Sequence, residues 1–240
     1  MKVSGIPMQY RVRQLNALAL LLAVAYALAA IKYTQSVTQI SPWIRDIFVY
    51  ATSIGVYRII IDVIFRIVER TTFFRRLYWG QLHIAGLWSY SYTIEGAPER
   101  TVYFGVWRFE QTLFATSVVG FGLTDEFDTR SHVRSVTDVI SNGNAYEVIN
   151  VRSDSVNSEA EVFSRTTMFF EQSSARFFKQ PDRMRGKTFV YGGPLTGRIC
   201  NNTFVRHVKA RTEQDVIDEL RHNLNEHGHV HGAVVRVVAS

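Results

Sequence analysis

Two long runs of apolar residues occupy the first third of the chain. The first extends from Leu15 to Ile31 and the second from Ile44 to Val68. A helix rises about 1.5 Å per residue, so about 20 apolar residues cross a hydrocarbon layer of about 30 Å. The pattern therefore predicts two transmembrane helices, at about 15–33 and 44–66, within an N-terminal region of residues 1–76.

Charge next to these runs predicts their orientation, because positive residues are retained on the cytoplasmic side of a membrane. The basic residues are Lys2, Arg11 and Arg13 before the first run, and Arg66, Arg70, Arg75 and Arg76 at the end of the second. We therefore expect a multi-pass protein with both termini in the cytoplasm. The first run also fits a secretory signal peptide that ends at Ala27-Leu28-Ala29. A buried hairpin in a soluble fold is a further alternative for both runs.

The second run carries charged residues. Arg58, Asp62 and Arg66 are spaced by four residues, so they share one face of the helix. Charges at membrane depth are costly and normally face protein or water, which makes Arg58 and Asp62 candidates for an oligomer contact or a polar seam. Alternatively, the span ends near Ile61, which places Asp62 and Arg66 among the lipid head groups.

After Arg76 the pattern changes to alternating apolar and polar residues, which is typical of strands. In the first of them, Trp88, Tyr90 and Tyr92 fall on one face. The eight strand candidates are Ile84–Ile94, Thr101–Glu110, Leu113–Leu123, Ser131–Ile140, Ala145–Ser153, Ala160–Glu171, Lys187–Tyr191 and Thr196–Val205. Consecutive antiparallel strands predict a small up-and-down barrel or a sandwich over residues 77–206, and eight strands make a barrel wide enough for one small ligand.

The last region, residues 207–240, predicts a helix at Thr212–Glu226. Thr212 is a natural N-cap, and an apolar stripe follows it. The stripe consists of Val216, Ile217, Leu220 and Leu224. The fold class expected from these patterns is a membrane-anchored all-β protein, with two N-terminal transmembrane helices, an eight-stranded antiparallel barrel and a short C-terminal helix.

Composition favours a binding protein over an enzyme. The formal net charge is +6, which suits anionic partners. The single cysteine, Cys200, cannot form an internal disulfide, and we expect it in the core or the barrel wall. Phosphate-loop, GxSxG, HExxH and CxxC signatures are all absent, so we expect neither catalysis nor a cofactor. The His227-x-His229-x-His231 spacing, near His222, could bind a metal, but a solvated tail is the favoured interpretation and no metal is expected.

Several strand residues that can point into the barrel are cationic, polar or aromatic. Guanidinium groups suit phosphates, and ring faces suit bases. The ligand-binding candidates are Tyr90, Tyr92, Trp107, Arg152, Arg165, Thr167, Arg198 and Asn202. Arg108 is the alternative to Trp107, and Asn150 and Val151 are alternatives to each other. Each arginine taken alone also fits the outer surface, and Trp88 is expected in the core.

The Gly86-x-Trp88 pair resembles the start of lipocalin-like barrels, in which such a tryptophan plugs the closed end. A short basic N-terminus, two closely spaced membrane helices and a barrel that opens with Gly86, Trp88 and Tyr90 resemble a group of bacterial defence effectors. These are the two-transmembrane-helix, β-barrel effectors of CBASS, the cyclic-oligonucleotide-based anti-phage signalling systems. The resemblance covers nearly the full chain and rests on architecture more than on an invariant motif.

The resemblance implies a lipocalin-like barrel that binds a cyclic dinucleotide made by a partner nucleotidyltransferase. Binding promotes homo-oligomerisation in that family, and the helices then disrupt the bacterial inner membrane and kill the infected cell. The implied partners are the cyclic dinucleotide, membrane lipids and other copies of the chain, with no nucleic-acid polymer among them. Two alternatives stay open: a membrane-anchored lipocalin-like carrier or sensor of an apolar ligand, and an anchored enzyme with an unrecognised site. A uniformly apolar lumen favours the carrier, and converging Arg, Asn and Thr side chains argue against it.

Overall fold

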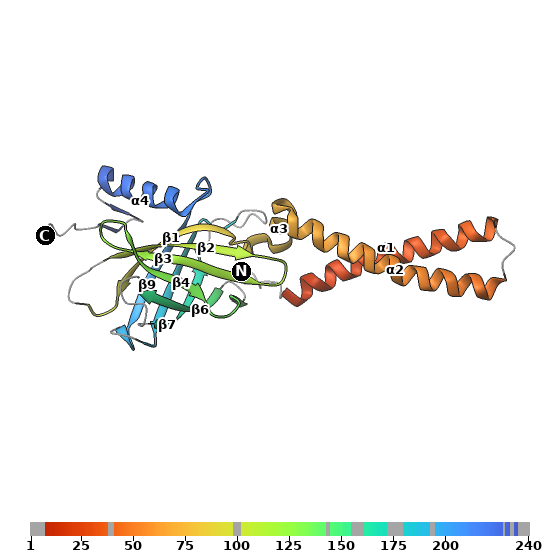
Figure 1. The fold of residues 1–240 in the computed structure, drawn as a ribbon, viewed down its shortest axis with the longest axis horizontal. Coiled ribbons are helices and arrows are strands. Elements are labelled where there is room, and N and C mark those ends of the chain that lie inside the picture. Colours follow the sequence, from red (N-terminus) through yellow and green to blue (C-terminus); the bar gives the residue numbers. More distant parts are fainter. Residues whose placement is uncertain are drawn as a thin grey trace. The chain divides into compact units, whose positions relative to one another are not determined.

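The computed structural model describes residues 8–37, 41–97, 102–142, 145–154, 161–171, 180–192, 195–227, 229–230 and 233–234 (Figure 1). The chain divides into two compact units, one formed by Ile6–Tyr78 and one whose main part is Trp79–Ser240. The first is helical and the second contains the strands. The division falls between Tyr78 and Trp79.

The first unit contains two long helices, α1 at Met8–Val37 and α2 at Pro42–Arg70, followed by a short helix, α3, at Thr72–Trp79. Pro42 occupies the first turn of α2, where its missing N–H leaves no hydrogen bond unmade. Both long helices contain segments that are long and apolar enough to cross a membrane, with mean hydropathies of 2.0 and 1.8. Both extend beyond the predicted spans, and α3 was not predicted.

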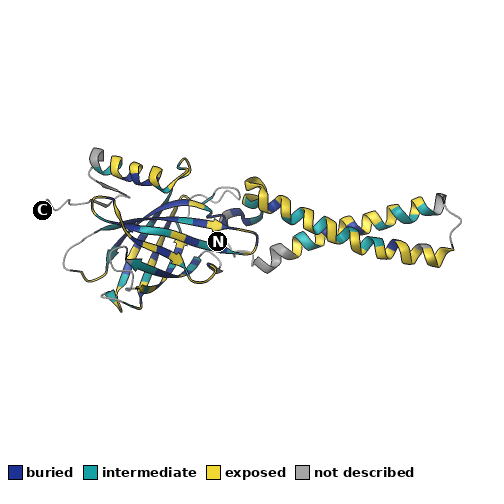
Figure 2. Cartoon of the chain, viewed as in Figure 1, coloured by how far each residue is buried: buried dark blue, intermediate teal, exposed yellow. Residues whose placement is uncertain are grey.

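α1 and α2 run antiparallel and pack against each other along one face of each helix. Ala19 and Ala23 on α1 and Val49 on α2 are buried, whereas Leu21 and Phe48 point outward and are exposed (Figure 2). Small residues such as alanine allow two helices to approach closely. Most apolar side chains of this unit are not covered by the unit itself, which fits membrane spans better than the hairpin of a soluble core.

The second unit is a closed antiparallel barrel of eight strands. Its strands are β1 (Gly86–Ile94), β2 (Tyr103–Gln111), β3 (Thr116–Leu123), β4 (Thr129–Ser135), β6 (Ala145–Asp154), β7 (Glu161–Phe170), β8 (Arg183–Val190) and β9 (Ile199–Arg206). Each pairs with the next, β4 pairs with β6, and β9 pairs back to β1, which closes the barrel. The predicted barrel is confirmed and the sandwich is excluded. The fourth strand ends earlier than predicted because the chain bends at Val136 and Thr137 before a short extra strand, β5 (Ile140–Asn142).

Trp88 lies in the core near the start of β1, which is the position that the resemblance to lipocalin-like barrels implies. Its side chain is fully buried, and its indole N–H donates to the Ile84 carbonyl at 2.8 Å. The Arg206 guanidinium lies 5.6 Å from the centre of the Trp88 ring and donates to the carbonyls of His83 and Ala85. The chain before β1 is therefore fixed across the barrel end, since its backbone groups are satisfied by side chains from the interior.

A helix, α4 (Glu213–His227), covers part of the outer surface of the barrel. Val216, Ile217 and Leu220 pack against Phe127, in the turn between β3 and β4, and against outward-facing residues of the sheet; these are Leu87, Phe104, Val106 and Leu123. The Thr212 hydroxyl accepts the backbone N–H of Asp215 at 3.2 Å, so the predicted N-cap is confirmed. In return, the Asp215 carboxylate accepts the N–H groups of Arg211 and Thr212, and these bonds hold its pKa below the usual value.

We expect Leu220→Ala to destabilise the protein by about 3 kcal/mol, because it leaves a void between α4 and the sheet. Urea unfolding of the full-length protein in detergent, followed by near-ultraviolet circular dichroism, measures this change. Asp218→Ala, on the exposed side of α4, is the matched control and should shift the unfolding free energy by less than about 0.5 kcal/mol. Equal effects of the two substitutions would contradict the packing role of α4.

Candidate functional site

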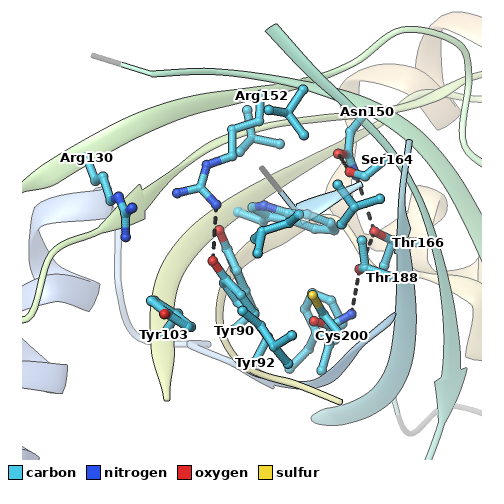
Figure 3. Close-up of a pocket in the computed structure, with 18 of the residues that line it drawn as sticks. Tyr90, Tyr92, Tyr103, Arg130, Asn150, Arg152, Ser164, Thr166, Thr188 and Cys200 are labelled. Carbon is cyan, nitrogen blue, oxygen red and sulfur yellow. Dashed lines mark hydrogen bonds between the residues drawn. The ribbon is translucent and has the colours of Figure 1, made fainter. Parts of the chain in front are cut away.

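The barrel encloses a cavity with a volume of about 390 Å³ (Figure 3). This volume lies within the range of small-molecule sites, about 300–1,000 Å³. Its lining residues are Tyr90, Tyr92, Ile94, Tyr103, Trp107, Arg130, Val133, Asn150, Arg152, Val162, Ser164, Thr166, Thr188, Val190, Gly192, Leu195, Cys200, Asn202 and Phe204. Almost all of these residues alternate along their strands, as expected for side chains that point into the lumen.

One wall of the cavity is aromatic. Tyr90 and Tyr92 alternate along β1, and their rings are nearly parallel, with centroids 6.1 Å apart. Tyr103 on β2 stacks on the other side of Tyr92 at 4.9 Å. Trp107 lies 5.2 Å from both Tyr90 and Phe204 and forms the floor above the closed end. A row of aromatic rings therefore lines one side of the cavity.

Tyr90 is fitted closely against a glycine. A Cβ atom added at Gly105 would lie only 2.3 Å from ring atoms of Tyr90, so the absence of a side chain there makes room for the phenol. Burial raises the pKa of Tyr90 far above its usual value, although Arg152 acts in the opposite direction. Tyr90 is therefore a neutral hydrogen-bonding group in this cavity.

We expect Gly105→Ala to cost about 1–3 kcal/mol of stability, because the new methyl group forces the Tyr90 ring out of its position. Gly192→Ala is the matched control, since a Cβ atom at Gly192 meets no atom closer than 3.7 Å. Thermal unfolding of both full-length variants measures the difference. A Gly105→Ala protein as stable as the control would show that Tyr90 is not held by this contact.

Two guanidinium groups reach the cavity. Arg152 extends from β6, where its Nε donates to the Ser131 hydroxyl at 2.6 Å and its Nη1 donates to the Tyr92 hydroxyl at 3.1 Å. Figure 3 shows this guanidinium above the hydroxyl groups of the tyrosine wall. The Arg130 guanidinium lies 6.0 Å from the centre of the Tyr103 ring. Positive charge thus meets the exposed end of the aromatic wall.

The facing wall carries a chain of polar side chains from four neighbouring strands. The Asn202 amide donates to the Thr188 hydroxyl at 2.7 Å, and that hydroxyl shares a hydrogen bond of 2.7 Å with Thr166. The Asn150 amide donates to Thr166 at 3.3 Å and accepts a hydrogen bond from Ser164. These bonds hold the amides and hydroxyls in fixed orientations, where they can also contact the edge of a bound ligand.

Cys200 lies in the wall of the cavity, as expected. Burial raises the pKa of its thiol, and the charge of Arg152 acts in the opposite direction. A thiol with a raised pKa is a poor nucleophile at neutral pH. Within the described part of the chain, no group of three or more His, Cys, Asp or Glu residues could hold a metal ion. His231, the last histidine of the His227-x-His229-x-His231 spacing, lies outside the described residues.

Five of the eight predicted ligand residues meet in this cavity: Tyr90, Tyr92, Trp107, Arg152 and Asn202. The prediction is wrong for the inward orientation of Arg165 and Thr167, because the lumen side of β7 carries Ser164 and Thr166. Arg165 is exposed and forms an ion pair with Glu147 at 2.7 Å.

Arg198 is also placed outside the cavity. It is exposed and precedes the first residue of β9, so strand alternation does not orient it. The two open alternatives are resolved. Trp107 and Asn150 point inward, whereas Arg108 points outward and pairs with Glu213 on α4 at 2.7 Å. Arg58 and Asp62 are exposed on α2, in the helical unit.

The sequence reasoning did not find Arg130, Tyr103 or the hydroxyl groups of Ser164, Thr166 and Thr188. Arg130 lies at a shift in the β3–β4 register, because Gly122 pairs with Ser131 and Leu123 pairs with Thr129. This bulge breaks the alternation and turns the side chain toward the cavity. No protein-family model matches the chain, and no curated protein is significantly similar to it.

Proposed function

We propose that this chain is a membrane-anchored effector whose barrel binds a cyclic dinucleotide. The observation that carries the proposal is the convergence of Arg130 and Arg152 on a wall of stacked tyrosines. Guanidinium groups form strong, charge-assisted hydrogen bonds with phosphate, and aromatic rings stack on bases. A cyclic dinucleotide contains two phosphates and two bases, so it offers partners for both features.

The polar wall supports the same ligand class. Asn150 and Asn202 carry both donors and acceptors, and the threonine hydroxyls between them can do either. Bases present donors and acceptors along their edges. A base that stacks on the tyrosines can therefore exchange hydrogen bonds with the wall opposite.

The lumen argues against a carrier that is built only for apolar ligands. An apolar ligand that covers charged or polar side chains removes water from them and offers no hydrogen bond in return, which costs binding free energy. Here Asn150, Arg152, Thr166, Thr188 and Asn202 all line the cavity. Apolar side chains also contribute, among them Ile94, Val162, Val190 and Leu195, and for this reason an apolar ligand belongs in the test.

The helical unit supplies the membrane part of the proposal. The distribution of basic residues supports two spans with both termini in the cytoplasm, and the resemblance to CBASS effectors implies a bacterial inner membrane. Ligand binding by the barrel then promotes assembly of the helices into a structure that disrupts the membrane. The architectural resemblance to CBASS effectors supports this output.

Titration of the purified full-length protein in lipid nanodiscs tests the sensing step. The panel contains several cyclic dinucleotides, the corresponding mononucleotides and a long-chain fatty acid, and tryptophan fluorescence reports binding next to Trp107. We expect saturable binding of at least one cyclic dinucleotide and none of the fatty acid. The proposal fails if no cyclic dinucleotide binds to protein that still unfolds cooperatively, and fatty-acid binding alone would establish the carrier.

Release of a trapped dye from vesicles tests the output. Vesicles that contain the protein should leak only after addition of a cyclic dinucleotide that bound in the titration. The same vesicles without protein, and protein-containing vesicles given a cyclic dinucleotide that did not bind, are the controls. Leakage that does not depend on the ligand would contradict gating.

A further inference from the structure

One face of α2 combines charged and small residues. Ala51, Gly55, Arg58 and Asp62 follow one another at spacings of three or four residues, so they form a single stripe, here called the outer stripe. All four are exposed. Ile60 lies midway between Arg58 and Asp62 in sequence and hence on the opposite side of the helix, because two residues correspond to about 200° of rotation.

The opposite side of α2 is the side that packs on α1. Val49 is buried, and Ser53, Val56 and Ile60 are partly buried, at the spacing of one helical face. α1 therefore does not cover the outer stripe. Figure 2 shows exposed residues along the outer sides of both helices.

Three hydroxyl groups of the helix pair are satisfied within their own helices. The hydroxyls of Thr34, Thr52 and Ser53 donate to backbone carbonyls three or four residues earlier, at distances of 2.6 to 3.0 Å. Arg58 and Asp62 differ from these, since among the described residues neither takes part in an ion pair. Arg58 and Asp62 are thus charged groups of the described helix pair that no ion pair satisfies.

The antiparallel arrangement indicates how deep these charges lie. Residues that are equally many positions from the connection between α1 and α2 lie at similar depths in the membrane. Arg66 is therefore at the depth of Arg13, and Arg58 is at the depth of Leu21. Arg13 marks one end of the apolar segment of α1, Arg13–Thr34. At about 1.5 Å per residue, Arg58 lies about 12 Å and Asp62 about 6 Å inside that end. An arginine can extend its long side chain toward the interface, but the short side chain of aspartate cannot.

We propose that the outer stripe of α2 binds the same stripe of a second copy of this chain, with Arg58 of each copy paired to Asp62 of the other. The inference rests on the membrane insertion that the proposed function includes. The pair is self-complementary because Arg58 and Asp62 carry opposite charges a single turn apart, whereas Arg66, one turn further on, lies level with Arg13 at the end of the apolar segment of α1. A Cβ atom at Gly55 would meet no atom within 4 Å, so the surface beside the charges is open to close approach of another helix.

Disulfide crosslinking in membranes tests this contact. The full-length protein with Cys200→Ser carries one new cysteine, either Ala51→Cys on the outer stripe or Ser53→Cys on the side packed on α1. The two changes are similar in size and differ in the face that they mark. We expect the crosslinked fraction after mild oxidation to be at least ten times larger for Ala51→Cys. Equal crosslinking, or none at position 51, overturns the proposal.

Charge reversal separates pairing between copies from pairing within one helix. In the Ala51→Cys background, Arg58→Asp alone gives two negative charges and Asp62→Arg alone gives two positive charges. Each variant should lose crosslinking with itself by at least tenfold. Co-expressed with tags of different size, the two should crosslink to each other and restore the wild-type fraction. A mixture that does not crosslink overturns the proposal, because an ion pair within each helix cannot be restored by mixing.

The same preparations distinguish this proposal from the proposed function. Both reversal variants should retain the thermal unfolding of the barrel and its affinity for the cyclic dinucleotide of the titration panel. A variant that loses both nucleotide binding and the unfolding transition is misfolded. In that case the double variant Arg58→Gln with Asp62→Asn, which is uncharged but similar in shape, replaces the reversals. It must abolish crosslinking. Crosslinking that persists in protein that binds no nucleotide supports the stripe and contradicts only the sensing function.

Discussion

Replacing Arg152 with glutamine should weaken binding of the cyclic dinucleotide by about 100-fold, or about 3 kcal/mol. Arg152 combines a full positive charge with a fixed direction, since Ser131 and Tyr92 both accept hydrogen bonds from its guanidinium. The absence of a side chain at Gly122 on β3 leaves space for the guanidinium, because a Cβ atom there would lie only 3.0 Å from Arg152 Nη2. Glutamine retains the polarity but loses the charge and the forked donors that phosphate requires.

Arg165→Gln is the matched control for that experiment. Arg165 lies on the next strand, and it is exposed on the outer surface and paired with Glu147. We expect its replacement to change affinity by less than about twofold, because solvent screens this exposed ion pair and no lining side chain is disturbed. Isothermal titration calorimetry of both variants in nanodiscs measures the difference. Equal losses in the two variants would indicate a general effect of charge, and no loss in Arg152→Gln would remove phosphate recognition from this cavity.

Salt provides a further readout of the same contact. Binding through guanidinium groups weakens as ionic strength rises, because salt screens charges that lie near the open end of a cavity. Raising the salt concentration from 50 to 500 mM shortens the Debye length from roughly 14 Å to about 4 Å. Over this range we expect the affinity of the wild type for the cyclic dinucleotide to fall, and the affinity of Arg152→Gln to fall less. Parallel salt dependences would show that Arg152 does not face the charge of the ligand.

Alternation along the chain was sufficient to predict the strands, but it left a barrel and a sandwich open; the resemblance to lipocalin-like barrels favoured the barrel. Inward-facing Trp88, Tyr90 and Tyr92 alternate with smaller polar residues, and each predicted strand has a counterpart in the structure. Alternation could not fix the phase of β7, in which hydroxyl residues occupy both faces around Arg165. A shift of one residue moves every side chain to the other face, so Arg165 and Thr167 were assigned to the lumen in place of Ser164 and Thr166.

The remaining lining residues depend on features that a single sequence does not reveal. Arg130 enters the cavity through a bulge, and bulges arise from strand pairing rather than from local sequence. The outer faces of β1 and β2 are buried because α4 covers them, which hides the alternation of burial that an uncovered strand would show. The direction of the charged stripe on α2 likewise required the position of α1, although its spacing was visible in the sequence.

Trp88→Ala should destabilise the protein by about 4 kcal/mol and lower the Tm by about 10 °C. The indole is fully buried, it packs edge-on against Phe109 at 6.1 Å, and its N–H satisfies the Ile84 carbonyl. Alanine removes these contacts and leaves Arg206 without the ring that it covers. The free energy of unfolding of a domain is only about 5–15 kcal/mol, so this single change removes a large fraction of it. Circular dichroism of the full-length protein in detergent measures the transition.

Two variants show whether the effect arises from closure of the barrel end. Trp43→Ala removes the same side chain from an exposed position on α2 and should leave the transition of the barrel unchanged. Trp88→Phe keeps the ring but loses the hydrogen bond to Ile84, so we expect it to recover more than half of the lost stability. The floor of the ligand cavity rests on this closed end, because Phe109 contacts both Trp88 and Trp107. Trp88→Ala should therefore also weaken ligand binding at temperatures at which the protein is still folded. A Trp88→Ala protein with wild-type stability would show that Arg206 and Phe109 close the barrel without the indole.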